Sequence, residues 1–276
     1  MVGTSRRPGS LPFVGTSDLS DPRVHNPDQS DDHRLAADLA DAAGRALVEL
    51  REAERPGRID PWDLRDAGDR LAHDLLMAEL RRQRPDDIVM SEEGADDPRR
   101  MQAERTWIVD PLDGTHDYPF LDSIEWAVHV ALVENQRPTA AAVAVPGLDQ
   151  VFSTDAGSHA DRTDRDEPLV ICGRSNGYFG GEVAQAIGGK LTACGSSGVK
   201  AMLVVSGAVD IYVHASGLYE WDVCAPAAVA EASGLVVSDL SGNEIIYNKA
   251  QPIVRGLVIC RPEFAEITRQ VLDRLI

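Results

Sequence analysis

Two aspartates, a glycine and a threonine stand together directly after an apolar stretch of the sequence. The apolar residues 107–109 lead into the motif Asp110-Pro111-Leu112-Asp113-Gly114-Thr115. Carboxylate oxygens are the ligands that hard cations such as Mg²⁺ take, and backbone N–H groups at the start of a helix can bind phosphate. The same residues could form an ordinary turn, because Asp-Pro and Asp-Gly are common turn dipeptides. The stretch alone therefore allows either a turn or a cation site at the end of a strand.

Two known carboxylate motifs do not match this spacing. An EF-hand loop that began at Asp110 would need oxygen ligands at positions 3 and 5, where Leu112 and Gly114 stand. Haloacid-dehalogenase phosphatases carry Asp-x-Asp-Gly-Thr with the aspartates two residues apart, whereas Asp110 and Asp113 are three apart. We therefore exclude both motifs.

Three further acidic motifs occur in an order that matches a known family. Ala67-Gly68-Asp69 and Ser91-Glu92-Glu93 precede the Asp-Pro-Leu-Asp-Gly-Thr motif, and Glu220-Trp221-Asp222 follows it. With these four motifs the sequence resembles the inositol monophosphatase superfamily over roughly residues 32–275. The resemblance implies an α/β (mixed α+β) protein, built as the layered α-β-α-β-α sandwich of the inositol monophosphatases and fructose-1,6-bisphosphatases.

The resemblance also implies a metal centre of two or three Mg²⁺ ions. Asp110 would bridge two of the ions, and a third, weaker ion would lie near Glu92 and Asp69. Mn²⁺ could replace Mg²⁺ and Li⁺ should inhibit, and we expect Ca²⁺ to inhibit because its coordination is looser. The implied ligands are Glu92, Asp110, the backbone carbonyl of Leu112, Asp113 and Asp222.

Asp69 and Thr115 are the catalytic residues that the resemblance implies. Thr115, oriented by Asp69, would position the attacking water and help to deprotonate it, although Thr115 could instead be a simple helix cap. Asp113, Gly114 and Thr115 would also contact the phosphate, since we expect Gly114 and Thr115 to open a helix. The activity would be hydrolysis of a small phosphorylated metabolite. His73 and His129 are interpreted as structural.

Several details resemble the CysQ-type branch of the superfamily, the 3′-phosphoadenosine-5′-phosphate phosphatases of actinobacteria. The segment GSSGVKAM contains Ser196, Ser197 and Lys200, which would contact a nucleotide, and Lys200 would meet a second anionic group. Lys200 could also be a solvated helix residue. His214 would face the sugar. A nucleoside 3′(2′),5′-bisphosphate is therefore the expected substrate.

Two departures from that branch leave other substrates open. The residues after Gly114-Thr115 are His116-Asp117-Tyr118 instead of a basic residue followed by Glu, and Asn176 stands where the branch has a histidine. Inositol monophosphate, a sugar (bis)phosphate or another nucleoside phosphate, including one from a specialised biosynthetic pathway, remains an alternative. The alternative from a different class of function is a non-catalytic regulator that binds a metal or a nucleotide. The complete set of motifs disfavours this alternative.

Composition and charge restrict the class of protein and its partners. The 276-residue chain is 43% hydrophobic and carries a formal net charge of −18, which disfavours binding to a nucleic-acid polymer. No apolar run approaches the roughly 20 residues of a membrane span. The four cysteines show no CxxC spacing, so we expect buried, reduced thiols in a cytoplasmic protein. A homodimer is possible.

Hydrophobic spacing predicts the elements that position these motifs. Residues 1–30 form a predicted disordered tail, followed by helices over 31–54 and about 66–82. A short strand over 87–93 and three strands between 125 and 155 complete a half of the molecule, 31–167, that carries most metal ligands. Alternating strands and helices over 168–276 form a second half that carries Asp222 and the substrate contacts.

Overall fold

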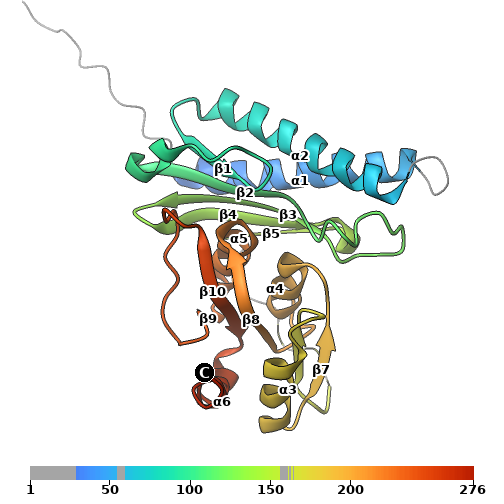
Figure 1. Ribbon diagram of the computed structural model, residues 1–276, viewed down its shortest axis with the longest axis vertical. Helices are drawn as coiled ribbons and strands as arrows, with labels where there is room; N and C mark the ends of the chain where they lie inside the picture. The colour runs from blue at the N-terminus through green and yellow to red at the C-terminus, as the bar shows by residue number, and fades with distance from the viewer. Residues whose placement is uncertain (1–28, 55–59, 156–160, 162, 164) are drawn as a thin grey trace, which may run out of the picture.

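The chain folds into five alternating layers of helices and sheets (Figure 1). The computed structural model describes residues 29–54, 60–155, 161, 163 and 165–276, so residues 1–28 of the predicted tail lie outside the described residues. Two helices cover one face of a first sheet, two lie between the sheets, and two cover the far face of the second sheet. The predicted α-β-α-β-α sandwich is confirmed.

The outer helical layer consists of α1 (Gln29–Ala53) and α2 (Pro61–Gln83). The apolar side chains that recur at helical spacing along both helices are buried against the first sheet. Helix α2 begins five residues earlier than the predicted start at residue 66. Asp60 accepts a hydrogen bond from the Trp62 amide at 2.9 Å, and Pro61 occupies the first turn, so these residues form an N-cap that the prediction missed.

The first sheet has five strands in the order β1-β2-β3-β4-β5. Strand β1 is parallel to β2, and the other neighbours are antiparallel. The three predicted strands between residues 125 and 155 are the antiparallel strands β3, β4 and β5, which are joined by short connections at residues 135–136 and 146–149. The strands are β1 (Ile88–Ser91), β2 (Arg105–Asp113), β3 (Ala127–Glu134), β4 (Arg137–Val145) and β5 (Gln150–Ser153), with short 3₁₀ helices at Pro98–Gln102 and Pro146–Leu148.

The second sheet is formed by the chain after residue 168, in the order β7-β6-β8-β10-β9. Its strands are β6 (Leu169–Cys172), β7 (Lys190–Ala193), β8 (Ile211–Tyr219), β9 (Val236–Ser238) and β10 (Ile253–Cys260). The middle layer contains α4 (Ser197–Val205) and α5 (Glu220–Ala232). The last layer contains α3 (Gly177–Ala186) and α6 (Ala265–Leu272), which follows a 3₁₀ turn at Pro262–Phe264.

Three apolar cores hold the layers together. One lies between the outer helices and the first sheet, one between the two sheets around α4 and α5, and one under α3 and α6. The middle core contains residues from both sheets, so it joins the two halves. All four cysteines are buried free thiols, as predicted. None of the helices in the described part of the chain combines the length and apolar character needed to cross a bilayer.

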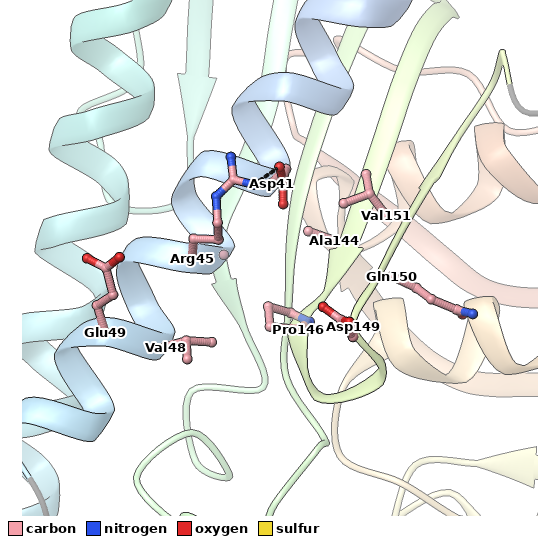
Figure 2. A pocket seen from close by; sticks show the side chains of 10 residues that line it. Asp41, Arg45, Val48, Glu49, Ala144, Pro146, Asp149, Gln150 and Val151 are labelled. Carbon is pink, nitrogen blue, oxygen red and sulfur yellow. Dashed lines mark ion pairs between the residues drawn. The ribbon is translucent and has the colours of Figure 1, made fainter.

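A groove of about 310 Å³ lies between α1 and the turn that joins β4 to β5 (Figure 2). A Cβ atom at Gly44 would lie 2.9 Å from the Pro146 ring, so a glycine allows α1 to approach this turn closely. Arg45 and Asp41 in the groove form an ion pair at 2.5 Å. Because its basic side chain is paired and its acids do not converge, we assign no chemistry to this groove.

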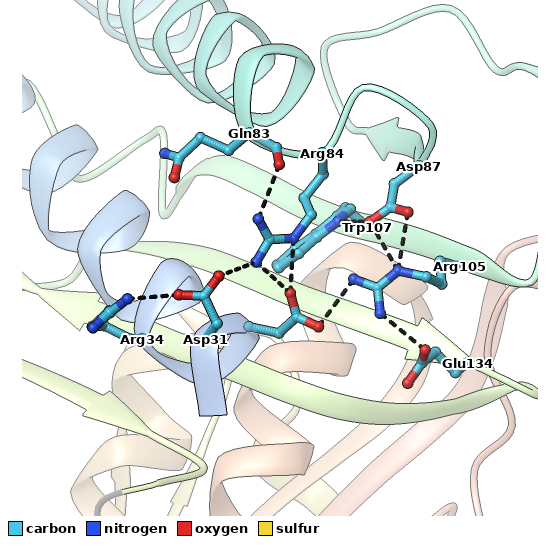
Figure 3. A network of polar contacts seen from close by, with 9 residues as sticks. Asp31, Arg34, Gln83, Arg84, Asp87, Arg105, Trp107 and Glu134 are labelled. Atoms are coloured by element: carbon cyan, nitrogen blue, oxygen red, sulfur yellow. Dashed lines mark hydrogen bonds and ion pairs between the residues drawn. The ribbon is translucent and has the colours of Figure 1, made fainter. Parts of the chain in front are cut away.

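A network of arginines and carboxylates joins α1, α2 and the first sheet (Figure 3). Asp32 is 2% exposed and accepts hydrogen bonds from Arg84 at 2.7 Å and from Arg105 at 3.0 Å. Arg105 also pairs with Asp87 at 3.0 Å and with Glu134 at 3.0 Å. Each buried charge therefore has an opposite charge beside it.

Candidate metal centre and active site

The C-terminal end of β2 carries the two aspartates of the central motif. Its side chains are buried along almost the whole strand, and Asp110 and Asp113 are only 1% and 8% exposed. The pairing of β2 with β3 shifts between these two residues, which marks an irregularity in the ladder. Asp110 Oδ1 accepts a hydrogen bond from the Leu112 amide at 3.1 Å, which holds the chain in this bend. The irregularity thus allows both carboxylates to face the same pocket.

The other acidic motifs meet β2 at this point. Glu92 follows β1, which is parallel to β2, and its amide donates to the Val109 carbonyl at 3.3 Å. Asp222 lies in the first turn of α5, where it accepts a hydrogen bond from the Tyr219 amide at 2.8 Å. A pocket of about 260 Å³ is lined by Glu92, Asp110, Leu112, Asp113, Gly114, Thr115 and Asp222 together with His116, Asp117, Arg174 and Gly195. All five predicted metal ligands therefore line one pocket.

The carboxyl groups of this pocket destabilise one another when they are charged. Burial, together with the charges of Glu92, Asp113 and Asp222, raises the pKa of Asp110 well above its ordinary value. Burial and the charge of Asp113 raise the pKa of Asp222 to about 7, and burial likewise raises the pKa of Glu92. The surroundings of Glu92, Asp110 and Asp222 thus favour the uncharged form of these three carboxyl groups.

A divalent cation fits this donor set. Oxygen atoms of Asp110, Asp113 and Asp222 lie within 4.8 Å of one another. Asp110 Oδ2 is buried and has no hydrogen-bond partner among the described residues. Buried acceptors without partners cost free energy, and hard cations prefer such oxygens. The arrangement is therefore chemically suited to hold Mg²⁺ or a similar ion.

Asp113 differs from its neighbours because α4 and His129 surround it with donors. Burial would raise its pKa, but the interaction with His129 and the contributions of Lys200 and Ser196 hold the pKa of Asp113 below its ordinary value. Ser196 Oγ donates to Asp113 Oδ2, as does the Gly198 amide at 2.7 Å. His129 and the N-terminus of α4 thus favour the ionised form of this one carboxylate.

Ser196 and Ser197 therefore have a different role from the one predicted. They are 0% and 5% exposed, and the Ser197 amide lies 3.2 Å from Asp113 Oδ1. The sequence predicts that both serines contact the substrate, whereas in the structure both form hydrogen bonds with Asp113. Their hydrogen bonds orient a predicted metal ligand.

Lys200 also departs from the prediction. Its side chain is 1% exposed, and its ammonium donates to the backbone carbonyls of Cys194, Gly195 and Ser196 at 3.2, 2.9 and 2.6 Å. It lies 5.2 Å from the centre of the Tyr212 ring. An ammonium whose three donors hold three carbonyls has no donor left for a substrate anion. We therefore correct the predicted substrate contact: Lys200 holds the loop before α4.

The segment after Asp113 is a turn, so the predicted helix at Gly114 is wrong. Gly114 has φ +87°, and a Cβ atom there would lie 2.3 Å from the Glu125 carbonyl oxygen. Both the backbone conformation and the space therefore require glycine. The amides of Asp117 and Tyr118 donate to the Gly114 carbonyl at 2.8 and 3.2 Å, which closes the turn instead of starting a helix.

The predicted catalytic pair is only partly assembled. Thr115 lines the pocket, but its hydroxyl donates to the Leu112 carbonyl at 2.9 Å. Asp69 lies in α2, and burial together with the charges of Glu93 and Glu92 raises its pKa to about 7. Asp69 therefore lies within electrostatic range of the acidic cluster. No Asp69–Thr115 hydrogen bond occurs among the described residues, so their contact would require the threonine hydroxyl to rotate.

The predicted substrate contact His214 lies outside the pocket lining. Its ring nitrogens lie 3.3 Å from the Tyr212 hydroxyl and 2.8 Å from the Ser216 hydroxyl. Burial and the positive charge of Lys200 lower its pKa to about 4, so the imidazole is neutral near pH 7. Asn176, the other departure noted in the sequence, occupies the N-cap position of α3 without a side-chain capping hydrogen bond and does not line the pocket.

Sequence analysis missed Arg174 and the full role of His129. Arg174 lines the pocket and makes two hydrogen bonds to Asp117, at 2.8 and 3.0 Å, and a further one to Glu125. His129 is fully buried, and its Nε2 approaches Asp113 Oδ2 at 3.3 Å. It pairs across the strands with Asp110. The signal available in the sequence was a single histidine, opposite the motif, in the apolar run of residues 127–133.

Comparison with known proteins agrees with this geometry. The inositol monophosphatase family model matches residues 30–273. The chain is 40% identical over 254 residues to a Mycobacterium leprae protein named 3′-phosphoadenosine 5′-phosphate phosphatase, covering 87% of this chain and 93% of that protein. It is 31% identical over 228 residues to the Escherichia coli K12 3′(2′),5′-bisphosphate nucleotidase CysQ, covering 76% and 91%.

A solved structure shares the fold as well. The crystal structure of CysQ from Bacteroides thetaiotaomicron aligns with a TM-score of 0.69 and 27% identity, over 84% of this chain and 97% of that chain. That protein is described as a bacterial member of the inositol monophosphatase family. The chain therefore belongs to the inositol monophosphatase family, and the resemblance found in its sequence motifs is confirmed.

Proposed function

We propose that this chain is a Mg²⁺-dependent phosphomonoesterase that acts on a nucleoside 3′(2′),5′-bisphosphate. The observation that carries the proposal is the convergence of Glu92, Asp110, Asp113 and Asp222 on one pocket, next to the Gly114-Thr115 turn. The names of the mycobacterial and Escherichia coli relatives support the substrate class. Family membership supports a metal-dependent phosphatase.

The cations would be held by oxygen ligands of this pocket. Glu92, Asp110, Asp113, Asp222 and the backbone carbonyl of Leu112 would hold two Mg²⁺ ions, with a third near Asp69. When bound, the ions would neutralise the carboxylates, polarise the phosphoryl group and help to activate water. The chain's own contribution is to keep the ligands fixed, as the α4 N-terminus and His129 do for Asp113.

Thr115 and Asp69 would move the proton of the attacking water. The Thr115 hydroxyl is at the pocket, and a rotation about its Cα–Cβ bond would release it from the Leu112 carbonyl. Asp69 can accept a proton near neutral pH because its pKa is raised to about 7. Asp69 is thus suited to act as a base through Thr115.

Arg174 is our candidate for recognising the second phosphate in place of Lys200. It is the one lysine or arginine among the residues that line the metal pocket. Asp117 and Glu125 hold its guanidinium over the pocket and orient it. A guanidinium can bind a phosphate through two hydrogen bonds, which suits a bisphosphate.

A phosphate-release screen tests the proposed substrate class. Purified protein with Mg²⁺ would be assayed on 3′-phosphoadenosine-5′-phosphate, adenosine 2′-phosphate, inositol-1-phosphate and fructose-1,6-bisphosphate. We expect the highest kcat/KM on the nucleoside bisphosphate. A higher kcat/KM on inositol-1-phosphate or on the sugar bisphosphate would overturn the substrate assignment, and no release from any of them would overturn the activity.

Arg174→Ala tests the second-anion contact. The loss of one charge-assisted hydrogen bond, about 1.5–3 kcal/mol, should lower kcat/KM on the bisphosphate roughly 10- to 150-fold. The loss on inositol-1-phosphate should be much smaller, because that substrate has no second anion. Arg174→Lys, which keeps the charge, should recover part of the activity. Equal losses on both substrates would assign Arg174 a structural role.

A further inference from the structure

The segment between β9 and β10 reaches from the second sheet to the first (Figure 1). It covers residues 239–252, and we call it the bridging segment. Tyr247 in this segment is 2% exposed, and its amide donates a hydrogen bond at 3.0 Å to the Gln136 carbonyl, in the turn between β3 and β4. The bridging segment is therefore anchored on the sheet whose strands lead to Glu92 and Asp110.

Asn248 is the residue of the bridging segment whose side chain binds the β1–β2 region. Its amide nitrogen donates to the Arg100 carbonyl at 2.9 Å and to the Thr106 hydroxyl at 3.2 Å. Its amide oxygen accepts a hydrogen bond from the Arg100 guanidinium at 2.9 Å. Arg100 and Thr106 are 1% and 0% exposed; Arg100 lies in the 3₁₀ helix between β1 and β2, and Thr106 lies in β2. These bonds fix the bridging segment against the strand that carries Asp110.

The bridging segment also binds the first turn of α5. Glu220 is 0% exposed, and its carboxylate accepts hydrogen bonds from the amides of Asn248 and Lys249 at 2.6 and 3.2 Å. The Glu220 amide donates to the Pro252 carbonyl at 2.9 Å. Asp222, a proposed metal ligand, lies two residues after Glu220 in the same helical turn. Asn248 is thus bonded both to β2 and to the helix that carries Asp222.

The metal pocket contains a repulsion that such a link would oppose. Negative charges on Asp110 and Asp222 repel each other, and this repulsion favours separation of α5 from β2. The two elements also share an apolar core, to which Ile108 of β2 and Val223 of α5 belong. Apolar contacts have little directional preference, whereas hydrogen bonds fix both distance and orientation. The polar link therefore defines the position of α5 more narrowly than the apolar core alone.

We propose that Asn248 is a positioning residue of the metal centre, which together with Arg100 and Glu220 holds Asp222 at its place opposite Asp110. The inference rests on the proposed function, because it assumes that these carboxylates bind Mg²⁺. Asn248 does not line the metal pocket, so it acts through the backbone of α5. Its φ of +56° lies in the left-handed region, which asparagine adopts more readily than most residues.

Isothermal titration of the metal-free protein with Mg²⁺ tests the proposal, at a temperature at which each variant is folded. Asn248→Gly removes the side-chain hydrogen bonds, and glycine keeps the positive φ without strain. The Kd for Mg²⁺ should rise roughly 10- to 100-fold, the effect typical of losing a group that orients metal ligands. The Mg²⁺ concentration that gives half-maximal phosphate release should rise by the same factor.

Two further variants separate positioning from a general contribution to stability. Asp32→Asn breaks the buried network beside α1, whose residues do not line the metal pocket, and it is the matched control. Its Kd for Mg²⁺ should stay within about twofold of the wild type, because distant sites act independently. Asn248→Asp keeps the oxygen that accepts from Arg100 and loses the donated hydrogen bonds, so its Kd should lie between those of the wild type and Asn248→Gly.

A double variant tests whether Asn248 and Glu220 form one link. Glu220→Gln keeps the size of the side chain but replaces one of the oxygens that accept from the Asn248 and Lys249 amides. Changes within one link are not additive. Asn248→Gly combined with Glu220→Gln should therefore raise the Kd for Mg²⁺ little beyond the larger single effect. Two effects that multiplied would show that the residues act separately and would overturn the link.

The results separate the positioning role from the proposed function. A folded Asn248→Gly with the Kd of the wild type would overturn the positioning role and leave the function standing. Equal rises of the Kd in Asn248→Gly and in Asp32→Asn would indicate a general effect of stability, which also overturns it. If Asn248→Gly did not fold, an unchanged Kd in Asn248→Asp would have the same meaning. A wild-type protein that bound no Mg²⁺ would overturn the proposed function itself.

Discussion

Buried charges lie at both ends of the parallel strands β1 and β2. At one end each acid is paired with an arginine, whereas at the other end several carboxyl groups converge. At the start of the strands, Asp87 and Arg105 belong to the network in which every acid has an arginine beside it (Figure 3). At the other end, Glu92, Asp110 and Asp113 converge with Asp222, and the pKa values of Glu92, Asp110 and Asp222 are raised. The first region pairs its charges within the protein, whereas the second is suited to bind positive charge from outside.

This difference shows how function can be recognised from charge balance. A buried ion pair that satisfies its hydrogen bonds costs little and orients the elements it joins. A buried cluster of like charges is destabilising, so its presence indicates a ligand that compensates it. The predictions below test this contrast, beginning with the largest expected effect.

Asp110→Asn should remove nearly all activity. Asp110 is 1% exposed and is the carboxylate predicted to bridge two ions, so we expect a loss of more than about 10⁴-fold, beyond the effect of a single acid–base group. The same change removes a negative charge that repels its neighbours once Asp110 is ionised, so at high pH the metal-free variant should melt at a higher temperature than the metal-free wild type. Steady-state kinetics and thermal melts check both effects. A variant that melts lower without metal would contradict the repulsion.

Thr115→Ala should lower kcat by roughly 10²- to 10⁴-fold, the usual range for a positioned acid–base group. Metal binding should persist, because the Thr115 side chain is not one of the proposed ligands. Isothermal titration with Mg²⁺ and single-turnover kinetics would separate the two effects. Turnover equal to that of the wild type would exclude a role for Thr115 in moving the proton.

Asp32→Asn should lower the free energy of unfolding and leave the kcat almost unchanged. The change removes the carboxylate between Arg84 and Arg105, and loss of one partner from a buried pair costs about 3–5 kcal/mol. We expect the free energy of unfolding measured in urea to fall by about 3 kcal/mol, the lower end of this range, because Arg84 still pairs with Asp31 and Arg105 still pairs with Asp87. The kcat at a temperature where the variant is folded should stay within about twofold of the wild type. A large loss of kcat would show that the two regions are coupled.

The stability of the metal-free protein should fall as the pH rises from about 4 to about 7. Burial and neighbouring charges raise the pKa of Asp69 and of Asp222 to about 7, from an ordinary value of 3.8. A raised pKa favours folding below the unfolded-state value, and that contribution is lost as the pH rises through the folded-state value. Asp113 has a lowered pKa, so its opposite effect lies below pH 4.

Added Mg²⁺ should reverse this loss of stability. The rise in melting temperature on addition of Mg²⁺ should be larger at pH 7.5 than at pH 5, because the ions bind ionised carboxylates. Thermal melts at several pH values, with EDTA and with Mg²⁺, provide the measurement. A shift that did not depend on pH would indicate binding outside the carboxylate cluster.

The sequence was sufficient to predict the layers and the metal pocket because both depend on local patterns. Helical spacing in α1 and apolar runs separated by turn residues after Trp126 identified the elements, and four ordered motifs identified the ligands that line one pocket. The early start of α2 could also have been predicted from Asp60-Pro61, an N-cap followed by a proline.

The substrate side of the pocket could not be predicted in the same way. Ser196 lies just before α4, and its tertiary contact with Asp113 directs it inward. Lys200 lies in the first turn of α4, and its ammonium is directed to the backbone carbonyls of the loop before the helix. The pairing of Arg174 with Asp117 joins positions 57 residues apart, which no local pattern reveals. The turn at Gly114 could not be predicted, because its φ of +87° and the close approach of the Glu125 carbonyl are features of the folded chain.

The most direct test of the account is the metal dependence of phosphate release from 3′-phosphoadenosine-5′-phosphate. The assay would start in excess EDTA, proceed by titration with Mg²⁺, and end with a challenge by Ca²⁺. We predict no release in EDTA, restoration by Mg²⁺ and suppression by Ca²⁺, because the carboxylate cluster at the end of β2 requires a small cation with strict geometry. Undiminished release in excess EDTA would contradict the central claim that this cluster works as a metal centre.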